Sequence, residues 1–130
     1  MSGETDLSKL LDSMNPVLQE GEYVFCSIDS RNNNWLKLES IGMFREEEGM
    51  TLIVDRQIAD QSNISYNSTF RLITLSVHSS LEAVGFLAAI TRRLAEHGIS
   101  VNAISAYYHD HLFVPAEKAN QVMELLREFG

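Results

Sequence analysis

The stretch that most constrains the fold of this chain covers residues 70–115. It opens with FRLITLSV, residues 70–77, an apolar and β-branched run that is typical of a strand. The following SSLE, residues 79–82, has the pattern of a capping box, and apolar residues with helical spacing continue from there to residue 97. Gly98 stands where a helix that ends in the left-handed conformation needs a residue without a Cβ atom. These signals predict a strand followed by a helix over residues 79–97.

Two more strands are expected after that helix, at residues 99–107 and 112–114. A polar tip at residues 108–110 joins them, and a last helix is predicted over residues 116–129. If residues 107 and 108 are extended, Tyr107 and Tyr108 face opposite sides, so one of them looks into a pocket and the other packs in a core or an interface.

The first half shows a similar order of elements. We expect a short amphipathic helix at residues 6–14, a strand at 22–28, and two strands at 42–46 and 50–56 around a glycine-containing hairpin. A short helix is predicted at 57–61, and the polar residues 62–69 are the best candidate for a linker.

Each half lacks a part of a complete α+β sandwich, and the second half most plainly lacks a final strand. Because a half of about 65 residues is marginally stable alone, we infer that the halves share a sheet or pack edge to edge. A strand exchanged from the N-terminal half would protect an otherwise open edge.

Composition narrows the classes of function. The 130 residues carry a net charge of -8, which argues against a surface for nucleic acids or anionic membranes, since both need a basic patch. No signal peptide or membrane-spanning run is recognisable, so we expect a cytoplasmic protein. Cys26, the only cysteine, lies in an apolar run and is expected to be a small buried core residue.

Three short sequences carry a resemblance to a known family. They are VHSSLEAVG at residues 77–85, LAEHGIS at residues 94–100, and ISAYYHDHLFVP at residues 104–115. With them, the chain resembles the tandem ACT-domain proteins, and it is most similar to the CASTOR-type branch and to short stand-alone bacterial members of the family.

The resemblance implies an α+β fold of two ferredoxin-like ACT units, each with the order βαββαβ. Their antiparallel sheets would pack side by side with the helices on one face, over an N-terminal domain at residues 1–65 and a C-terminal domain at residues 66–130. It implies a non-catalytic regulatory protein that binds a small amino acid or related metabolite at a domain interface. Such a protein would need no cofactor and would form a homo-oligomer, such as a dimer.

The expected site binds both the carboxylate and the amino group of an amino acid. A helix start near Ser79 and Ser80 offers N–H and hydroxyl donors to a carboxylate. The resemblance places Asp110 against the amino group, although a turn aspartate with a local role is the other interpretation. The predicted ligand-binding residues are His78, Ser79, Ser80, Val84, Gly85, Phe86, Tyr108, His109 and Asp110. Many metabolic-enzyme ACT domains have Asp or Asn followed by Pro-Gly at the first turn, so their ligand preference is not carried over to this sequence.

Two alternatives to amino-acid binding stay open. One is an oligomerisation module without a ligand. The other is a metal-binding protein that uses His109 and His111, which share a face of an extended chain but lack a third ligand at a recognisable spacing. No phosphate loop, nucleophile elbow or catalytic triad order is present, so we do not expect an enzyme.

Overall fold

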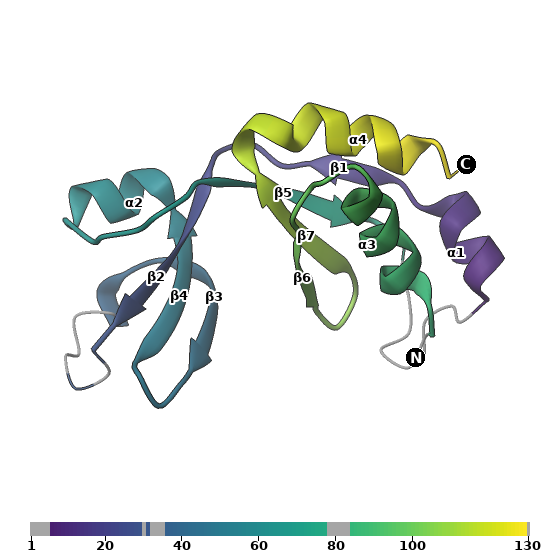
Figure 1. Cartoon of the computed structure of the whole chain (residues 1–130). Coiled ribbons are helices and arrows are strands. Elements are labelled where there is room, and N and C mark those ends of the chain that lie inside the picture. Colours follow the sequence, from purple (N-terminus) through teal and green to yellow (C-terminus); the bar gives the residue numbers. More distant parts are fainter. Residues whose placement is uncertain (1–5, 30, 32–35, 78–83, 130) are drawn as a thin grey trace. The chain divides into compact units, whose positions relative to one another are not determined.

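The protein is described from a computed structural model covering residues 6–29, 31, 36–77 and 84–129 (Figure 1). The chain divides into two compact units. Unit 1 combines Met1–Glu20 with Arg71–Gly130, and unit 2 is Gly21–Phe70. Each unit is described by itself. The division of the chain into domains at residues 1–65 and 66–130 stays a prediction.

Unit 1 contains α1, α3, α4 and most of a four-strand sheet. Its elements are α1 (Leu7–Ser13), β1 (Pro16–Leu18), β5 (Phe70–Leu75), α3 (Phe86–Glu96), β6 (Asn102–Ser105), β7 (Asp110–Pro115), a 3-10 turn η2 (Ala116–Lys118) and α4 (Ala119–Arg127). The strand order is β1-β5-β7-β6. It is the order of a ferredoxin-like βαββαβ unit whose last strand comes from the start of the chain.

The short strand β1 fills the position that the second half lacks. It pairs antiparallel with β5, from Pro16 opposite Leu75 to Leu18 opposite Ile73. This pairing confirms that a strand from the N-terminal half completes the C-terminal one. The α+β class with ACT-like units is also confirmed, whereas the side-by-side packing of the two sheets stays a prediction.

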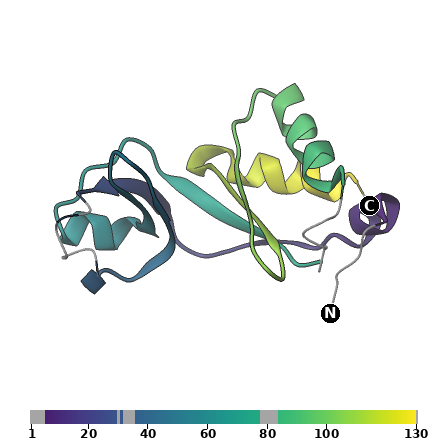
Figure 2. The ribbon, with the colours of Figure 1, turned by 90° about the horizontal axis from the view of Figure 1, so that it is seen from below.

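The helices of unit 1 bury one face of its sheet. Figure 2 shows α3 and α4 next to each other. Fully buried side chains from helices and strands form one core: Leu10 of α1, Ile73 and Leu75 of β5, Ile90 and Leu94 of α3, Leu112 and Val114 of β7, and Val122 of α4. Because side chains alternate along a strand, every second residue of β5 and β7 faces this core.

Helix α3 begins later than the sequence predicts. Its first residue is Phe86, and Gly85 is the N-cap with φ 90°, in the left-handed region. Val84 is not helical, so the predicted helix over residues 79–97 is wrong at residues 84 and 85, and the capping-box residues 79–82 lie outside the described residues. The reason is that the left-handed Gly85 cannot continue a helix from residues before it.

The other end of α3 agrees with the prediction. Gly98 has φ 71°, and its N–H donates to the carbonyl of Ala95 at 2.9 Å, while the Ile99 N–H donates to Leu94 at 3.0 Å. These two bonds form a Schellman motif.

The turn between β6 and β7 lies earlier in the chain than predicted. The Ala106 N–H donates to the carbonyl of His109 at 3.0 Å, which leaves Tyr107 and Tyr108 at the tip. Asp110 pairs with Ser105 and is the first residue of β7. The prediction of Asp110 in the tip and a strand from residue 112 is therefore wrong, because the strand pairing extends two residues further toward the turn.

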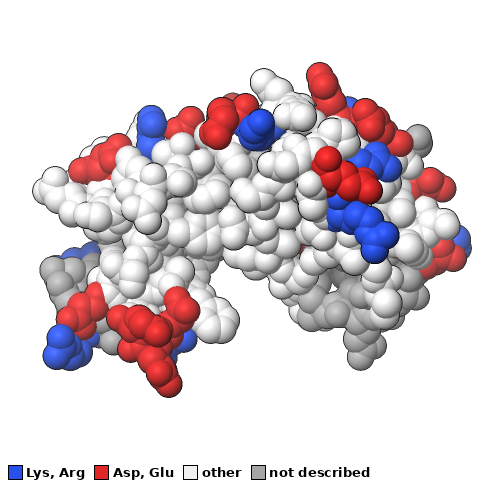
Figure 3. Space-filling view, viewed as in Figure 1, with Lys and Arg blue, Asp and Glu red and all other residues white. Residues whose placement is uncertain are grey.

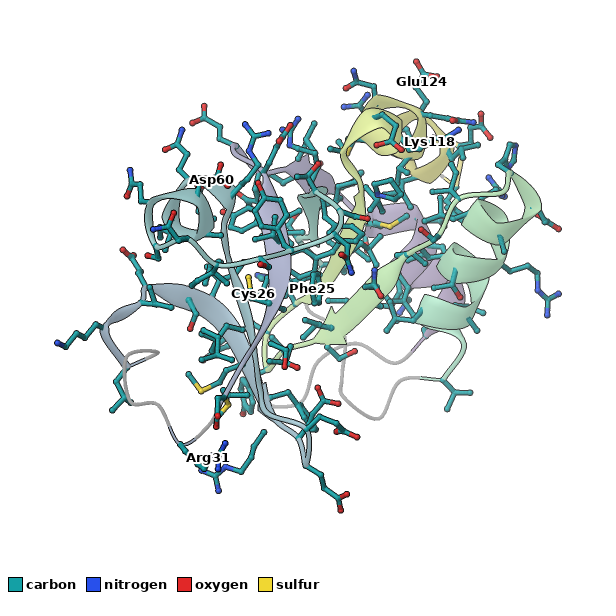
Figure 4. The ribbon with its side chains drawn as sticks, turned by 60° about the vertical axis from the view of Figure 1, so that its left-hand side comes forward. Phe25, Cys26, Arg31, Asp60, Lys118 and Glu124 are labelled. Atoms are coloured by element: carbon teal, nitrogen blue, oxygen red, sulfur yellow. The ribbon has the colours of Figure 1, made fainter. Side chains whose placement is uncertain are left out.

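Within its described residues, unit 2 has three strands and one α-helix. They are β2 (Tyr23–Ile28), β3 (Ser40–Arg45), β4 (Met50–Asp55) and α2 (Arg56–Gln61), with strand order β3-β4-β2 and Phe70 paired to Tyr23. These elements confirm the predicted strands, hairpin and helix. Cys26 is buried in the unit's core (Figure 4), which confirms the prediction of a small buried core residue. This burial raises the pKa of its thiol.

Among the described residues, no helix has both the length and the apolar character needed to cross a membrane.

Candidate functional site

One end of the unit 1 sheet brings several predicted site segments together. At this end β5 finishes and β7 begins, and the two strands are neighbours. The Thr74 hydroxyl of β5 lies 3.0 Å from Nδ1 of His111 in β7. Ser76, just after β5, donates from its N–H at 3.2 Å and from its hydroxyl at 2.6 Å to the carbonyl of Asn15. The α1–β1 connection, the exit of β5 and the start of β7 therefore meet at one place.

Asp110 is the buried charged group at this end. Its side chain is 6% exposed, and the Ser105 hydroxyl donates to its Oδ1 at 2.6 Å. Asp110 shares the helix-covered face of β7 with Leu112, since the two residues are two apart in a strand. A buried carboxylate is costly unless charged or polar groups surround it, and the Ser105 hydroxyl is one such group.

Ser105 was not among the predicted site residues. The signal that identifies it is the pairing across the hairpin, in which Ser105 lies directly opposite Asp110. That pairing depends on where the turn lies, and the sequence prediction placed the turn too far along the chain.

The predicted residues at the start of α3 lie in different environments. Val84 is 84% exposed, whereas Phe86 is buried in the core of unit 1 beside Ile90. His78, Ser79 and Ser80 lie outside the described residues. The role of all these residues in ligand binding stays a prediction.

Both tyrosines of the hairpin are exposed. The rings of Tyr107 and Tyr108 are 4.9 Å apart and meet edge to face at the turn. The expectation that they face opposite sides of an extended chain is wrong, because neither residue is in a strand.

His109 and His111 lie on the face of the sheet opposite Asp110. Their ring centroids are 6.5 Å apart, which confirms that they share a face. The Thr74 hydroxyl contacts His111 Nδ1 and also accepts from Gln19 Nε2 at 3.1 Å. Burial lowers the pKa of His111, with a further contribution from the charge of His109, while Asp110 acts in the opposite direction.

A metal site has limited support in the part of the chain that the structure describes. There, no group of three or more His, Cys, Asp or Glu side chains is close enough together to hold an ion. Zinc sites in proteins use three or four protein ligands, so the two histidines alone offer too few.

Two hollows are lined by described residues, and Asp110 belongs to neither lining. One hollow of about 390 Å³ in unit 1 follows the outer side of α3, and another of about 330 Å³ in unit 2 lies between β3 and α2. The first is lined by Gly85, Ala88, Ala89, Arg92, Arg93, Glu96 and Phe129. Only Gly85 belongs to the predicted site.

Family comparison identifies the class of protein to which this fold belongs. Two family models of the ACT domain match in tandem, one over residues 2–71 and the other over residues 67–128. The chain therefore belongs to the ACT-domain family, which confirms the resemblance found in the sequence.

Among solved structures, a Vibrio cholerae protein of unknown function, described as a possible transport protein, is 50% identical to this chain. The match covers 95% of this chain and 94% of that one, with a TM-score of 0.86. No protein with a curated description matches the chain.

Two more distant structures show the fold alone. A protein from Agrobacterium tumefaciens is 14% identical over 90% of this chain and 89% of that one, with a TM-score of 0.74. The ligand-free regulatory subunit of aspartate kinase from Thermus thermophilus is 9% identical over 91% and 97%, with a TM-score of 0.67.

Proposed function

We propose that this chain is a non-catalytic, cytoplasmic regulatory protein that binds a small amino acid or related metabolite. Two ACT domains in tandem support a regulatory ligand-binding role. The regulatory subunit of aspartate kinase, named above as a structural relative, agrees with this role at the level of the fold. The single observation that carries the proposal is the buried Asp110, held by Ser105 where the exit of β5 meets the start of β7.

In this proposal Asp110 receives the amino group of the ligand. The carboxylate is fixed in direction by the Ser105 hydroxyl, so it is already oriented before the ligand arrives. A charge-assisted hydrogen bond of this kind contributes about 1.5–3 kcal/mol. That contribution corresponds to about a tenfold to a hundredfold gain in affinity.

The rest of the proposed site surrounds this contact. The ligand's carboxylate is assigned to His78, Ser79 and Ser80, which lie outside the described residues. The residues predicted to line it are Val84, Gly85, Phe86, Tyr108 and His109, of which His109 lies on the face of the sheet opposite Asp110. We further propose that the site is completed at an interface between ACT domains, in one chain or between two copies. Ligand then stabilises that arrangement by the difference between its affinities for the joined and the separate forms.

The proposal is tested by thermal shift and isothermal titration of the full chain with each of the twenty amino acids. A ligand at a hundred times its Kd adds about 2.7 kcal/mol to stability, which is readily detected. If no amino acid shifts the melting temperature at millimolar concentration, amino-acid binding is refuted.

Asp110→Asn tests the placement of the site. This change keeps the shape of the side chain and an acceptor for Ser105, but it removes the charge. Affinity for the identified amino acid should fall by about tenfold to a hundredfold. Asp12→Asn, an exposed position in α1, is the matched control and should leave affinity unchanged. Unchanged affinity in Asp110→Asn would mean that the ammonium contact is wrongly placed.

A ligand-free oligomerisation module is the second candidate. It is favoured by the exposed apolar side chains Ile41, Met43 and Phe44 on β3, the outer strand of the unit 2 sheet. Stable oligomers together with no response to any amino acid would support this candidate over the first.

A further inference from the structure

Helix α1 and the residues next to it contact both the end of β5 and the start of α3. After β5, Ser76 donates from its N–H at 3.2 Å and from its hydroxyl at 2.6 Å to the carbonyl of Asn15, which follows α1. Before α3, a Cβ atom placed on Gly85 would lie 3.6 Å from Cδ2 of Leu7, so this leucine covers the glycine. The two ends of α1 therefore hold two places that are nine positions apart in the sequence.

The α1 segment, residues 6–15, depends on packing for its structure. Its helix has seven residues, and a helix this short is not stable in water by itself. Within α1 only Leu10 is fully buried, while Leu11 and Met14 are partly buried against the same core. With so few contacts to lose, the segment is expected to dock and undock as one piece, at a lower free energy than unfolding of the whole unit.

Charge is not what holds the α1 segment in place. Asp6, Lys9 and Asp12 are exposed, and no ion pair between described residues joins them to the rest of unit 1. Figure 3 shows charged side chains of both signs over α3, but the contacts of α1 itself are apolar or use the backbone. The contacts of Leu7, Leu10 and Asn15 are therefore the ones that decide whether the segment is docked.

Strand β1 keeps the segment close when it undocks. β1 pairs with β5 over three residues, and directly after it the Gln19 N–H donates to the carbonyl of Leu72 at 2.9 Å. This ladder does not involve α1, so it can stay formed while the helix leaves. Because the helix stays tethered, its local concentration is high and undocking is readily reversed.

We propose that α1 docks reversibly and in doing so couples the end of β5 to the start of α3. The docked segment holds Ser76 and Gly85 together, and when it leaves, both lose a contact. The core that buries Phe86, the first residue of α3, loses Leu10 at the same time. A molecule that binds more tightly to the docked form at one of these places therefore also stabilises the other. This coupling goes beyond the proposed function and does not depend on any ligand at Asp110.

Hydrogen exchange of single amides, measured by NMR on the full chain, tests the coupling. Three N–H groups report on α1, on the end of β5 and on the first turn of α3: those of Leu10, Ser76 and Ala89, which donate to the carbonyls of Asp6, Asn15 and Gly85. If one undocking event exposes all three, their protection factors should agree within about threefold. The Ile99 N–H, which donates to Leu94 at the far end of α3, should be protected at least about tenfold more.

Two variants each change one end and are read at the other. Ser76→Ala removes the hydroxyl bond to Asn15 and should speed exchange of the Ala89 amide about fivefold, the effect of one lost hydrogen bond. Leu7→Ala removes the cover from Gly85 and should speed exchange of the Ser76 amide about threefold, the effect of a partly buried side chain. Neither variant should change exchange of the Ile99 amide.

Matched controls make the same substitutions in unit 2. Ser65→Ala and Leu36→Ala alter exposed residues and should leave exchange of all three reporting amides unchanged. Circular dichroism should show that all four variants keep the fold.

Two results would overturn the proposal. One is that each variant speeds exchange only at its own end, which would mean that the contacts of α1 act separately. The other is that the three reporting amides exchange no faster than the Ile99 amide, which would mean that α1 leaves only when the whole unit unfolds. Titration of the same samples with amino acids reports on the Asp110 site separately, so either failure leaves the proposed function untouched.

Discussion

The packing of Leu10 gives the sharpest test of the division into units. Leu10 lies in α1, is 0% exposed, and packs in the core of unit 1 with side chains from β5, α3, β7 and α4. Truncating a fully buried leucine to alanine costs about 2–5 kcal/mol, since it removes apolar contacts and leaves a cavity. For a domain whose total stability is about 5–15 kcal/mol, that loss is large.

A neighbouring leucine provides the control. Leu7 lies one turn earlier in the same helix but is 38% exposed. Leu7→Ala makes the same chemical change with the same effect on helix propensity. Because Leu7 is partly exposed, this change should cost about 1 kcal/mol or less of stability. With a urea dependence of about 2 kcal/mol per molar, Leu10→Ala should lower the unfolding midpoint by about 1.5 M and Leu7→Ala by about 0.5 M.

Hydrogen exchange locates the effect. Peptides from β5 and α4 should lose protection in Leu10→Ala, and peptides from β2 and β4 of unit 2 should change less, because foldons exchange as separate cooperative units. The reasoning is refuted if Leu10→Ala is no worse than Leu7→Ala, or if protection is lost mainly in unit 2.

Two further predictions follow from local geometry. Because burial holds the pKa of His111 below its ordinary value of 6.5, the unfolded chain binds a proton at this residue at a higher pH than the folded chain does. Stability should therefore fall as pH drops below about 6.5 and level off below the pKa of His111 in the folded protein. This pH dependence should flatten in the His111→Gln variant. An NMR titration midpoint of His111 at or above 6.5 would contradict the prediction. Gly98→Ala should cost about 1 kcal/mol through its backbone alone, because φ is 71° and a Cβ atom there meets nothing within 4 Å. Thermal unfolding measures this loss of stability. Gly98→Asn should lose less stability than Gly98→Ala. If the alanine variant is as stable as the wild-type protein, the left-handed helix end is ruled out.

The order of helices and strands was predictable because it rests on local patterns. The apolar residues of α1, the β-branched strands β4 and β5, and the glycine after α3 each carry their signal within a few residues. It was also predictable that the second half needs an additional strand, because its own elements lack the final strand of a complete α+β sandwich. Its identity was not, because β1 has only three residues and begins with Pro16, which gives no alternation to detect.

The candidate site was less predictable because its residues depend on where turns fall. The capping-box pattern at residues 79–82 favours a helix start there, but the left-handed Gly85 places the start of α3 at Phe86. The polar run from Tyr107 to Asp110 contains several turn-forming residues. The pairing of Ser105 with Asp110 decides which of them form the turn, and sequence composition does not determine that register.

The completion of unit 1 by the start of the chain has a consequence for protein synthesis. Residues 7–18 leave the ribosome before β5, β7 and α4, against which they pack, because these elements lie about 50 to 110 residues later in the sequence. Until then, Leu10 and the edge of β1 remain available to other molecules in the cell. Folding that must close so long a loop is also slower than folding through local contacts. Production of this protein should therefore depend on chaperones.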